Sequence, residues 1–179
     1  MPNDPIPEVM DGEALLEVLL RHGVEFILIG GFAAILQGSP IPTNDLDITP
    51  MTAPENYTRL SAALTELDAK VRAEGVEPLR FNHNAESLAD AAIWNLSTKF
   101  GDLDITTVPS GTTGFNDLRR DAITIKLGAI SFNVASLADI VRSKGTANRD
   151  KDRRALPVLR ELLARETLSQ AEARRHKKK

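Results

Sequence analysis

The residues of this chain best suited to chemistry are aspartates placed on short apolar stretches. Asp45 and Asp47 stand in DLDIT, where the alternation of polar and apolar residues predicts a strand that sends both carboxylates to one face. The pattern returns in GDLDITT, with Asp104 inside the alternation and Asp102 at an expected turn. Carboxylates on neighbouring strands suit Mg²⁺, which takes oxygen ligands. We therefore expect Asp45, Asp47 and Asp104 to hold one or two Mg²⁺ ions.

A glycine pair precedes the first aspartate pair. Gly30 and Gly31 follow the apolar stretch EFILI, which we expect to be a buried strand, and they lead into a short predicted helix over 32–37. Glycines let backbone N–H groups approach a ligand closely, and the positive end of a helix favours phosphate. Either motif alone is also typical of an ordinary turn or a solvated strand end. Their order and spacing together favour a site for a metal and a phosphate group.

A lysine near the C-terminal end of the chain is a third candidate. Lys144 falls near the end of a predicted helix that Ser136 caps, and from there its ammonium group could reach a cleft and hold nucleotide phosphates. The alternative is an ordinary lysine that stabilises a helix C-terminus. Asp152 could orient Lys144 or Arg149, or it could favour the dipole of its own helix.

The composition excludes several kinds of site. The 179 residues include no cysteine and three histidines, which excludes disulfides, thiolate zinc sites and cysteine nucleophiles. No apolar run approaches the roughly 20 residues that span a bilayer. The first residues lack the basic and apolar regions of a secretory signal. We therefore expect a cytoplasmic protein with no membrane partner.

The charge is divided unevenly along the chain. Residues 1–141 carry a net charge of −11, and residues 142–179 carry +8. Such a basic end could bind a polyanion, or it could be a solvated helix with a frayed tail.

The order of predicted elements favours an α/β (α+β) fold: a mixed sheet with flanking helices and a C-terminal helical segment. We divide the chain into a catalytic core over 1–135 and a C-terminal helical segment with a basic tail over 136–179. Pro157 requires the last predicted helix to kink or restart. The expected elements are an extended lead-in over 1–10, helices over 11–22, 55–67, 85–90, 115–119, 136–146 and 150–165, and strands over 25–29, 45–49, 93–100, 103–108, 122–127 and 130–134, with a strand pair within 70–80.

The stretches iGGfAailxG…TxDxD, the second D-x-D-like strand and SK…RxKD together resemble the nucleotidyltransferase superfamily, and specifically its small toxin branch with the AbiEii-like and MenT-type toxins. The resemblance covers about residues 25–49, 101–107 and 137–160, and it implies a polymerase-beta-like fold. It also implies site roles for eight residues: a phosphate-gripping turn at Gly30 and Gly31, a hydroxyl at Thr43, metal ligands at Asp45, Asp47 and Asp104, a nucleotide-facing lysine at Lys144 and a catalytic acid at Asp152.

The function that the resemblance implies is that of a Mg²⁺-dependent toxin of a toxin–antitoxin system. Such an enzyme would transfer an NMP from an NTP (ATP, CTP or UTP) to RNA, with the 3′ end of tRNA as the expected acceptor, and would block translation. The basic C-terminal segment would bind the tRNA, and a cognate antitoxin would be a further partner. Two alternatives stay open: an antitoxin that transfers AMP to a tyrosine of a partner protein, and a non-catalytic module that binds a partner.

Overall fold

The computed structural model of the chain describes residues 9–177. Most of the extended lead-in expected over 1–10, and the last two lysines of the basic tail, lie outside the described residues. Within the described range, no helix has both the length and the apolar composition that crossing a bilayer requires.

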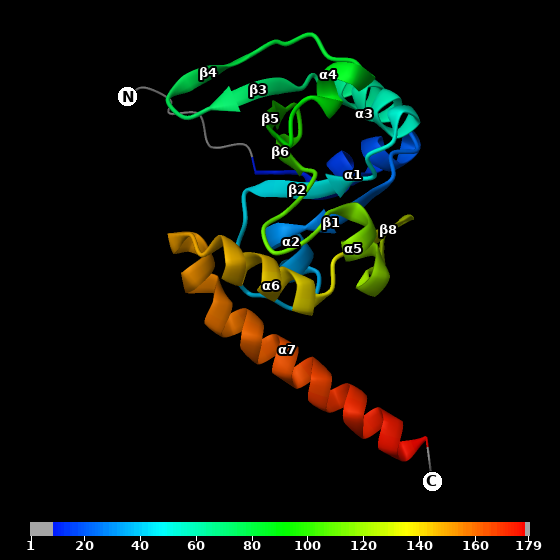
Figure 1. The fold of residues 1–179 in the computed structure, drawn as a ribbon, viewed down its shortest axis with the longest axis vertical. Helices are drawn as coiled ribbons and strands as arrows, with labels where there is room; N and C mark the ends of the chain where they lie inside the picture. Colours follow the sequence, from blue (N-terminus) through cyan, green and yellow to red (C-terminus); the bar gives the residue numbers. More distant parts are fainter. Residues whose placement is uncertain (1–8, 178–179) are drawn as a thin grey trace.

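One mixed sheet of eight strands runs through the molecule (Figure 1), in the spatial order β4-β3-β5-β6-β2-β1-β8-β7. Neighbouring strands are antiparallel except in two pairs, β2 with β6 and β1 with β8, which are parallel. The strands are β1 (Phe26–Ile29), β2 (Asp45–Pro50), β3 (Lys70–Ala73), β4 (Val76–Leu79), β5 (Ile93–Thr98), β6 (Gly101–Thr106), β7 (Ile123–Leu127) and β8 (Ile130–Val134).

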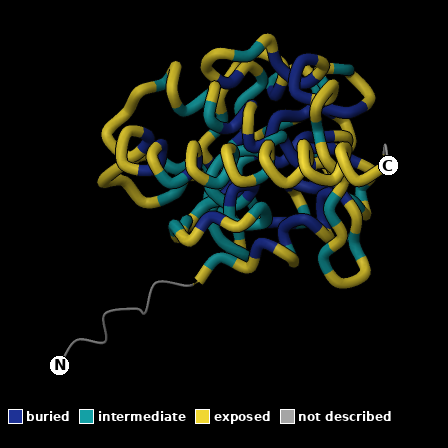
Figure 2. Tube along the Cα trace, turned by 90° about the horizontal axis from the view of Figure 1, so that it is seen from below, coloured by how far each residue is buried: buried dark blue, intermediate teal, exposed yellow. Residues whose placement is uncertain are grey.

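The described part of the chain forms seven helices, and the last of them extends away from the sheet (Figure 1). Figure 2 shows that this helix, which ends at the C-terminus, is mostly exposed along its length. The helices are α1 (Gly12–Arg21), α2 (Gly30–Ile35), α3 (Pro54–Glu66), α4 (Ala85–Ala89), α5 (Phe115–Asp121), α6 (Leu137–Ala147) and α7 (Asp150–His176).

Burial of alternate residues in β2 and β6 fixes which face carries the aspartates. Leu46 and Ile48 of β2 and Leu103 of β6 are fully buried in the hydrophobic core. Because side chains alternate across a strand, the aspartates beside them leave the opposite face of the sheet. A shift of one residue in register would expose the leucines and isoleucine and bury the aspartates. Burial of the apolar residues therefore keeps the aspartates on the opposite face.

The predicted α/β fold with a mixed sheet and a helical C-terminal segment is confirmed. The prediction for the last helix was wrong in its end: α7 continues past Arg165 to His176 as one helix that contains Pro157, so no restart occurs. Pairs four residues apart support this extension, Glu161 with Arg165 and Glu166 with Gln170. Helix α2 begins at Gly30 rather than Phe32.

Candidate functional site

The parallel pairing of β2 with β6 brings the predicted aspartates together. Asp45 lies opposite Asp102, and Asp47 lies opposite Asp104. Oxygens of Asp45, Asp47 and Asp104 all lie within 4.8 Å of one another. Asp102, expected at a turn, is instead the second residue of β6. The carboxylates of two separate stretches of sequence therefore converge on one face of the sheet.

The glycine pair lies directly against these carboxylates. Gly30 has a φ of +72°, and a Cβ atom there would lie 2.3 Å from Oδ2 of Asp47. A Cβ atom on Gly31 would lie 2.8 Å from Oγ1 of Thr43. The Thr43 hydroxyl in turn donates a hydrogen bond of 2.6 Å to Oδ1 of Asp45. Close approach and backbone conformation therefore both require glycine at position 30.

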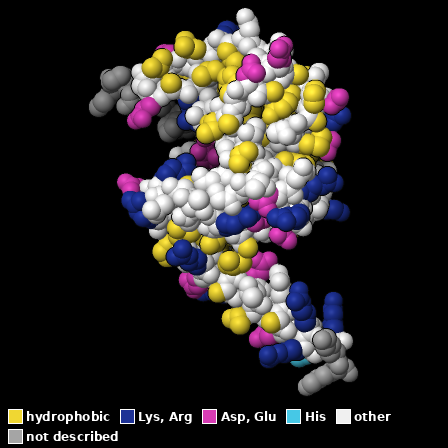
Figure 3. All heavy atoms as spheres, viewed as in Figure 1, with side chains coloured by type: hydrophobic (Ala, Val, Ile, Leu, Met, Phe, Trp, Pro, Cys, Tyr) yellow, Lys and Arg dark blue, Asp and Glu magenta, His cyan; other side chains and the backbone are white. Residues whose placement is uncertain are grey.

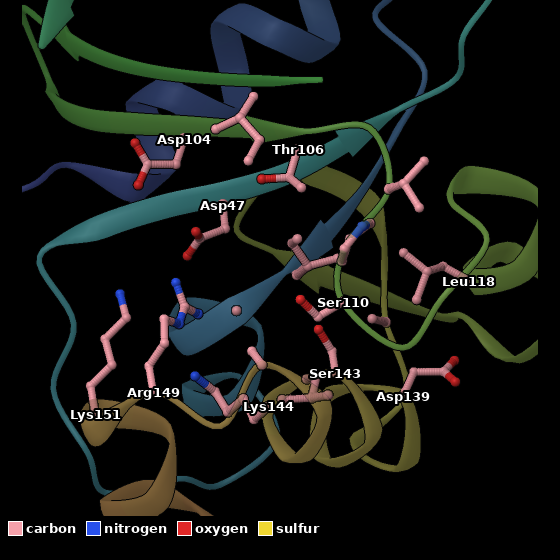
Figure 4. A pocket seen from close by; sticks show the side chains of 18 of the residues that line it. Asp47, Asp104, Thr106, Ser110, Leu118, Asp139, Ser143, Lys144, Arg149 and Lys151 are labelled. Carbon is pink, nitrogen blue, oxygen red and sulfur yellow. The ribbon is translucent and has the colours of Figure 1, made fainter. Parts of the chain in front are cut away.

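Three cationic side chains face the aspartates from the other side. Lys144 comes from α6, Arg149 from the residue before α7, and Lys151 from its first turn; all three lie below Asp47 in Figure 4. Asp152 is fully buried behind them. Its carboxylate accepts hydrogen bonds from Nζ of Lys144 at 3.2 Å and from Nε of Arg149 at 2.7 Å. Asp152 therefore holds two of the cations and does not itself line the cavities of this site.

Two adjoining cavities separate the aspartates from the cations. The larger has a volume of about 430 Å³ and the smaller about 140 Å³, and Gly30, Asp47, Lys144, Arg149 and Lys151 line both. Thr43, Gly31 and Asp45 line only the smaller cavity, and Asp104 lines only the larger one. The space-filling view shows a hollow at this side of the molecule, with an acidic side chain inside it and Lys or Arg at its lower rim (Figure 3).

The electrostatics of the site indicate a place for a cation. Burial is the largest cause, and together with the charges of Asp45 and Asp104 it raises the pKa of Asp47 to about 7, against the lowering effect of Lys151 and Lys144. Burial also raises the pKa of Asp104, against the lowering effect of Arg72. Crowded carboxylates that supply only oxygen ligands fit a hard divalent ion such as Mg²⁺.

The pKa of Asp152 shifts in the opposite direction, downward. Burial, the largest influence, acts to raise the pKa of its carboxyl, but the hydrogen bonds and charges of Arg149 and Lys144 outweigh it, and the pKa is lowered. The carboxylate therefore stays ionised at neutral pH and keeps its two cationic partners in place.

Sequence reasoning missed Arg72 of β3. Its guanidinium donates a hydrogen bond of 2.7 Å to Oδ1 of Asp104, and its Nε lies 3.2 Å from Oδ2 of Asp102. No spacing could have revealed this contact, because it depends on β5 lying between β3 and β6. Lys151 is the lysine of the RxKD stretch, but its position in the sequence did not predict that it lines the site.

Comparison with known proteins identifies the fold. No family model matches the chain, and no curated protein matches it in sequence. The lincomycin-bound crystal structure of the lincosamide antibiotic adenylyltransferase LnuA is similar with a TM-score of 0.56, at 14% identity, over 84% of this chain and 94% of LnuA. A candidate nucleotidyltransferase from Thermotoga maritima has a TM-score of 0.47 at 17% identity, over 90% of this chain and 92% of its own. The chain thus shares its fold with LnuA.

Proposed function

We propose that this protein is a nucleotidyltransferase that transfers an NMP from an NTP to a hydroxyl group of an acceptor. The observation that carries the proposal is the arrangement around the two adjoining cavities: three aspartate oxygens within 4.8 Å of one another on one side, and Lys144, Arg149 and Lys151 on the other. Carboxylates to hold a metal and cations to hold phosphates are the two parts that phosphoryl-group chemistry requires.

Each group of residues has a role in this proposal. The triphosphate lies between the Gly30–Gly31 turn and the three cations, where backbone N–H groups and positive charges meet its oxygens. Asp45, Asp47 and Asp104 would hold Mg²⁺, as one or two ions. When bound, Mg²⁺ neutralises phosphate charge and lowers the pKa of the attacking hydroxyl.

The transfer itself follows from this placement. The acceptor oxygen forms a bond to the α-phosphorus, the bond from that phosphorus to the bridging oxygen of the β-phosphate breaks, and pyrophosphate leaves. The hydroxyl proton passes to a carboxylate, for which Asp104 is placed at the edge of the larger cavity. Fixed charges and in-line positioning supply most of the rate, because little covalent chemistry falls to the protein.

The acceptor that the charge distribution favours is RNA, and we propose the 3′ end of tRNA. Residues 142–179 carry a net charge of +8, whereas the rest of the chain is acidic. Helix α7 extends from the body and ends in the exposed residues Arg174 and Arg175. Contacts to phosphates dominate RNA affinity and need no sequence reading. In this proposal residues 1–135 supply the metal ligands, and residues 136–179 supply the cationic side chains.

A modified tRNA 3′ end cannot be aminoacylated, so the protein would inhibit translation. We therefore also propose that it is the toxin of a toxin–antitoxin pair, with a cognate antitoxin as its partner. A producing cell needs such a partner, because the activity would otherwise act on its own tRNA.

A small hydroxylated molecule is the second candidate acceptor. Ile93 and Val108 line the larger cavity, yet their side chains are 58% and 57% exposed. Exposed apolar groups at a cavity mouth can contact the carbon skeleton of a small ligand. LnuA, which shares the fold, is a lincosamide adenylyltransferase.

The decisive experiment follows a labelled NMP. The purified protein is incubated with Mg²⁺ and each labelled NTP, together with total tRNA, lincomycin or a candidate partner protein, and tRNA 3′ ends are sequenced. We expect label on tRNA, and a loss of at least about 1,000-fold in Asp45→Ala because an essential ligand is removed. Asp121→Ala, an exposed aspartate at the end of α5, is the matched control and should keep full activity.

The other outcomes separate the alternatives. Label on lincomycin supports the small acceptor, and label on a tyrosine of the partner protein supports the AMP-transferring antitoxin. No label and no Mg²⁺-dependent NTP binding, with an intact fold, leave a non-catalytic binding module. Full activity in Asp45→Ala contradicts the metal site.

A further inference from the structure

Arg72 holds two carboxylates of the aspartate face together, and nothing in the proposed reaction yet uses it. It lies in β3, two strands away from β6, and its side chain reaches over β5. The guanidinium donates to Oδ1 of Asp104 at 2.7 Å, and Nε lies 3.2 Å from Oδ2 of Asp102. The planar fork of arginine can meet two carboxylates at once, which a lysine ammonium cannot do with fixed geometry.

We propose that Arg72 is a positioning residue that fixes the Asp104 carboxylate in the orientation needed to ligate a divalent cation. This inference rests on the proposed function. Because Arg72 occupies Oδ1 of Asp104, it leaves Oδ2 available for an ion and sets the plane of the carboxylate. Groups that hydrogen-bond to a ligating carboxylate commonly set metal affinity in this way, and losing one costs roughly 10–100-fold.

The surroundings show that this ion pair is not an ordinary surface contact. The Asp104 side chain is 18% exposed and that of Arg72 is 34% exposed, whereas Arg80, in the same part of the chain, pairs with Asp68 at 79% exposure. Exposed ion pairs contribute little to stability. Arg72 also carries its positive charge beside the carboxylates of Asp102 and Asp104, which repel each other.

The positive charge of Arg72 and its orientation of Asp104 change the metal affinity in opposite directions, so a single variant distinguishes the two effects. Its positive charge repels a divalent cation, so a purely electrostatic role predicts that Arg72→Gln binds metal more tightly. Orientation of Asp104 predicts that the same variant binds metal more weakly. Arg72→Lys retains the charge but loses the fork, so orientation predicts weakened binding there as well.

The experiment measures Mn²⁺ binding by calorimetry with the full-length protein, without NTP and with a non-hydrolysable NTP analogue. We expect Mn²⁺ affinity to fall about tenfold in Arg72→Gln and in Arg72→Lys. We also expect kcat to fall by about tenfold or more, while KM for the NTP changes little. Arg80→Gln is the matched control, and thermal unfolding confirms that each variant is folded.

Unchanged or tighter Mn²⁺ binding in folded Arg72→Gln overturns the role of Arg72 and leaves the proposed function standing. A wild-type protein that binds no Mn²⁺ under either condition overturns the metal site and the role of Arg72 together. The two failures are therefore distinguishable.

Discussion

Asp47 is the residue at which folding and chemistry conflict most directly. It is half-buried, lies opposite Asp104 and near Asp45, and touches the Gly30 backbone. Its pKa of about 7 means that the folded protein without metal holds a proton there which the unfolded chain, with an aspartate pKa near 3.8, releases. Without a bound cation, the Asp47 carboxyl group is therefore mostly protonated below about pH 7.

This conflict predicts a pH dependence of stability. Between about pH 4 and pH 7 the folded state binds more protons than the unfolded state, so the free energy of unfolding should fall as the pH rises through that window and then level off. Asp47→Asn, which stays neutral at every pH, should lose this component. Thermal unfolding of both proteins without metal, from pH 4.5 to pH 8.5, measures the difference. Parallel curves for the two proteins would contradict the raised pKa.

The same titration predicts that metal binding strengthens with pH. Mg²⁺ binds the ionised carboxylate, so its affinity should rise as the pH approaches about 7 and become constant above it. Calorimetric titrations at pH 6, 7 and 8 test this. A constant affinity across that range would contradict either the raised pKa of Asp47 or its role as a ligand.

Gly30 gives a third prediction at the scale of single residues. A Cβ atom at this position would lie 2.3 Å from Oδ2 of Asp47, and the φ of +72° is unfavourable for alanine. Gly30→Ala should abolish metal binding and transfer, while the strained φ costs about 1–2 kcal/mol of stability. Gly145→Ala is the control: it lies inside α6 with open space around it and should stabilise the helix by about 0.5–1 kcal/mol. Mn²⁺ binding by a folded Gly30→Ala protein would contradict this prediction.

At the scale of elements, the helix junction between α6 and α7 forms the cationic side of the site. Asp152 is the third residue of α7, and it accepts from the backbone N–H and side chain of Arg149 as well as from Lys144. One buried carboxylate thereby caps α7 and joins it to α6. The junction fixes two cationic side chains of the site, Lys144 and Arg149, at once.

Asp152→Ala should therefore affect both stability and nucleotide binding. Removing one partner of a buried ion pair leaves Lys144 without its counter-charge, at a cost of about 3 kcal/mol. The KM for the NTP should rise, because Lys144 and Arg149 are no longer held. Asp150→Ala is the matched control: it removes an 81% exposed first-turn aspartate that pairs with Arg153, and it should cost less than about 1 kcal/mol. Urea unfolding and steady-state kinetics measure both effects. Equal effects of the two variants would refute the junction role.

The elements also show what the sequence could and could not predict. Strong patterns located the strands that carry the aspartates, because the apolar alternation of DLDIT and GDLDITT determines which face is buried. The end of α7 was missed because residues 167–176 are exposed and so lack the apolar periodicity that predicts a helix from sequence. The role of Arg72 could not be predicted, because its partner Asp104 lies two strands away in the sheet. The spacing of residues along the sequence does not give the order of the strands. The sequence thus predicted which aspartates lie together better than it predicted the contacts that orient them.

At the scale of the whole molecule, the charge is divided between an acidic body and a basic C-terminal end. If RNA is the acceptor, its binding should depend strongly on salt, with log Kd rising linearly with log salt concentration because counterions are released. Deleting residues 167–179 should weaken RNA binding and flatten that slope without affecting the fold, since this part of α7 is exposed. Filter binding at 50–200 mM salt, with NTP binding as the control, measures this. If the deletion leaves the slope unchanged, RNA does not bind to the C-terminal end of α7.

The crossover between β2 and β6 has a consequence for the chain as it is made. Asp45 and Asp47 emerge from the ribosome long before Asp104, and Lys144 and Arg149 emerge later still. No nascent fragment that ends before residue 104 can assemble the complete set of carboxylates, and none that ends before residue 149 has the full set of anchored cations. If the proposed function is right, the protein is therefore inactive through most of its own translation.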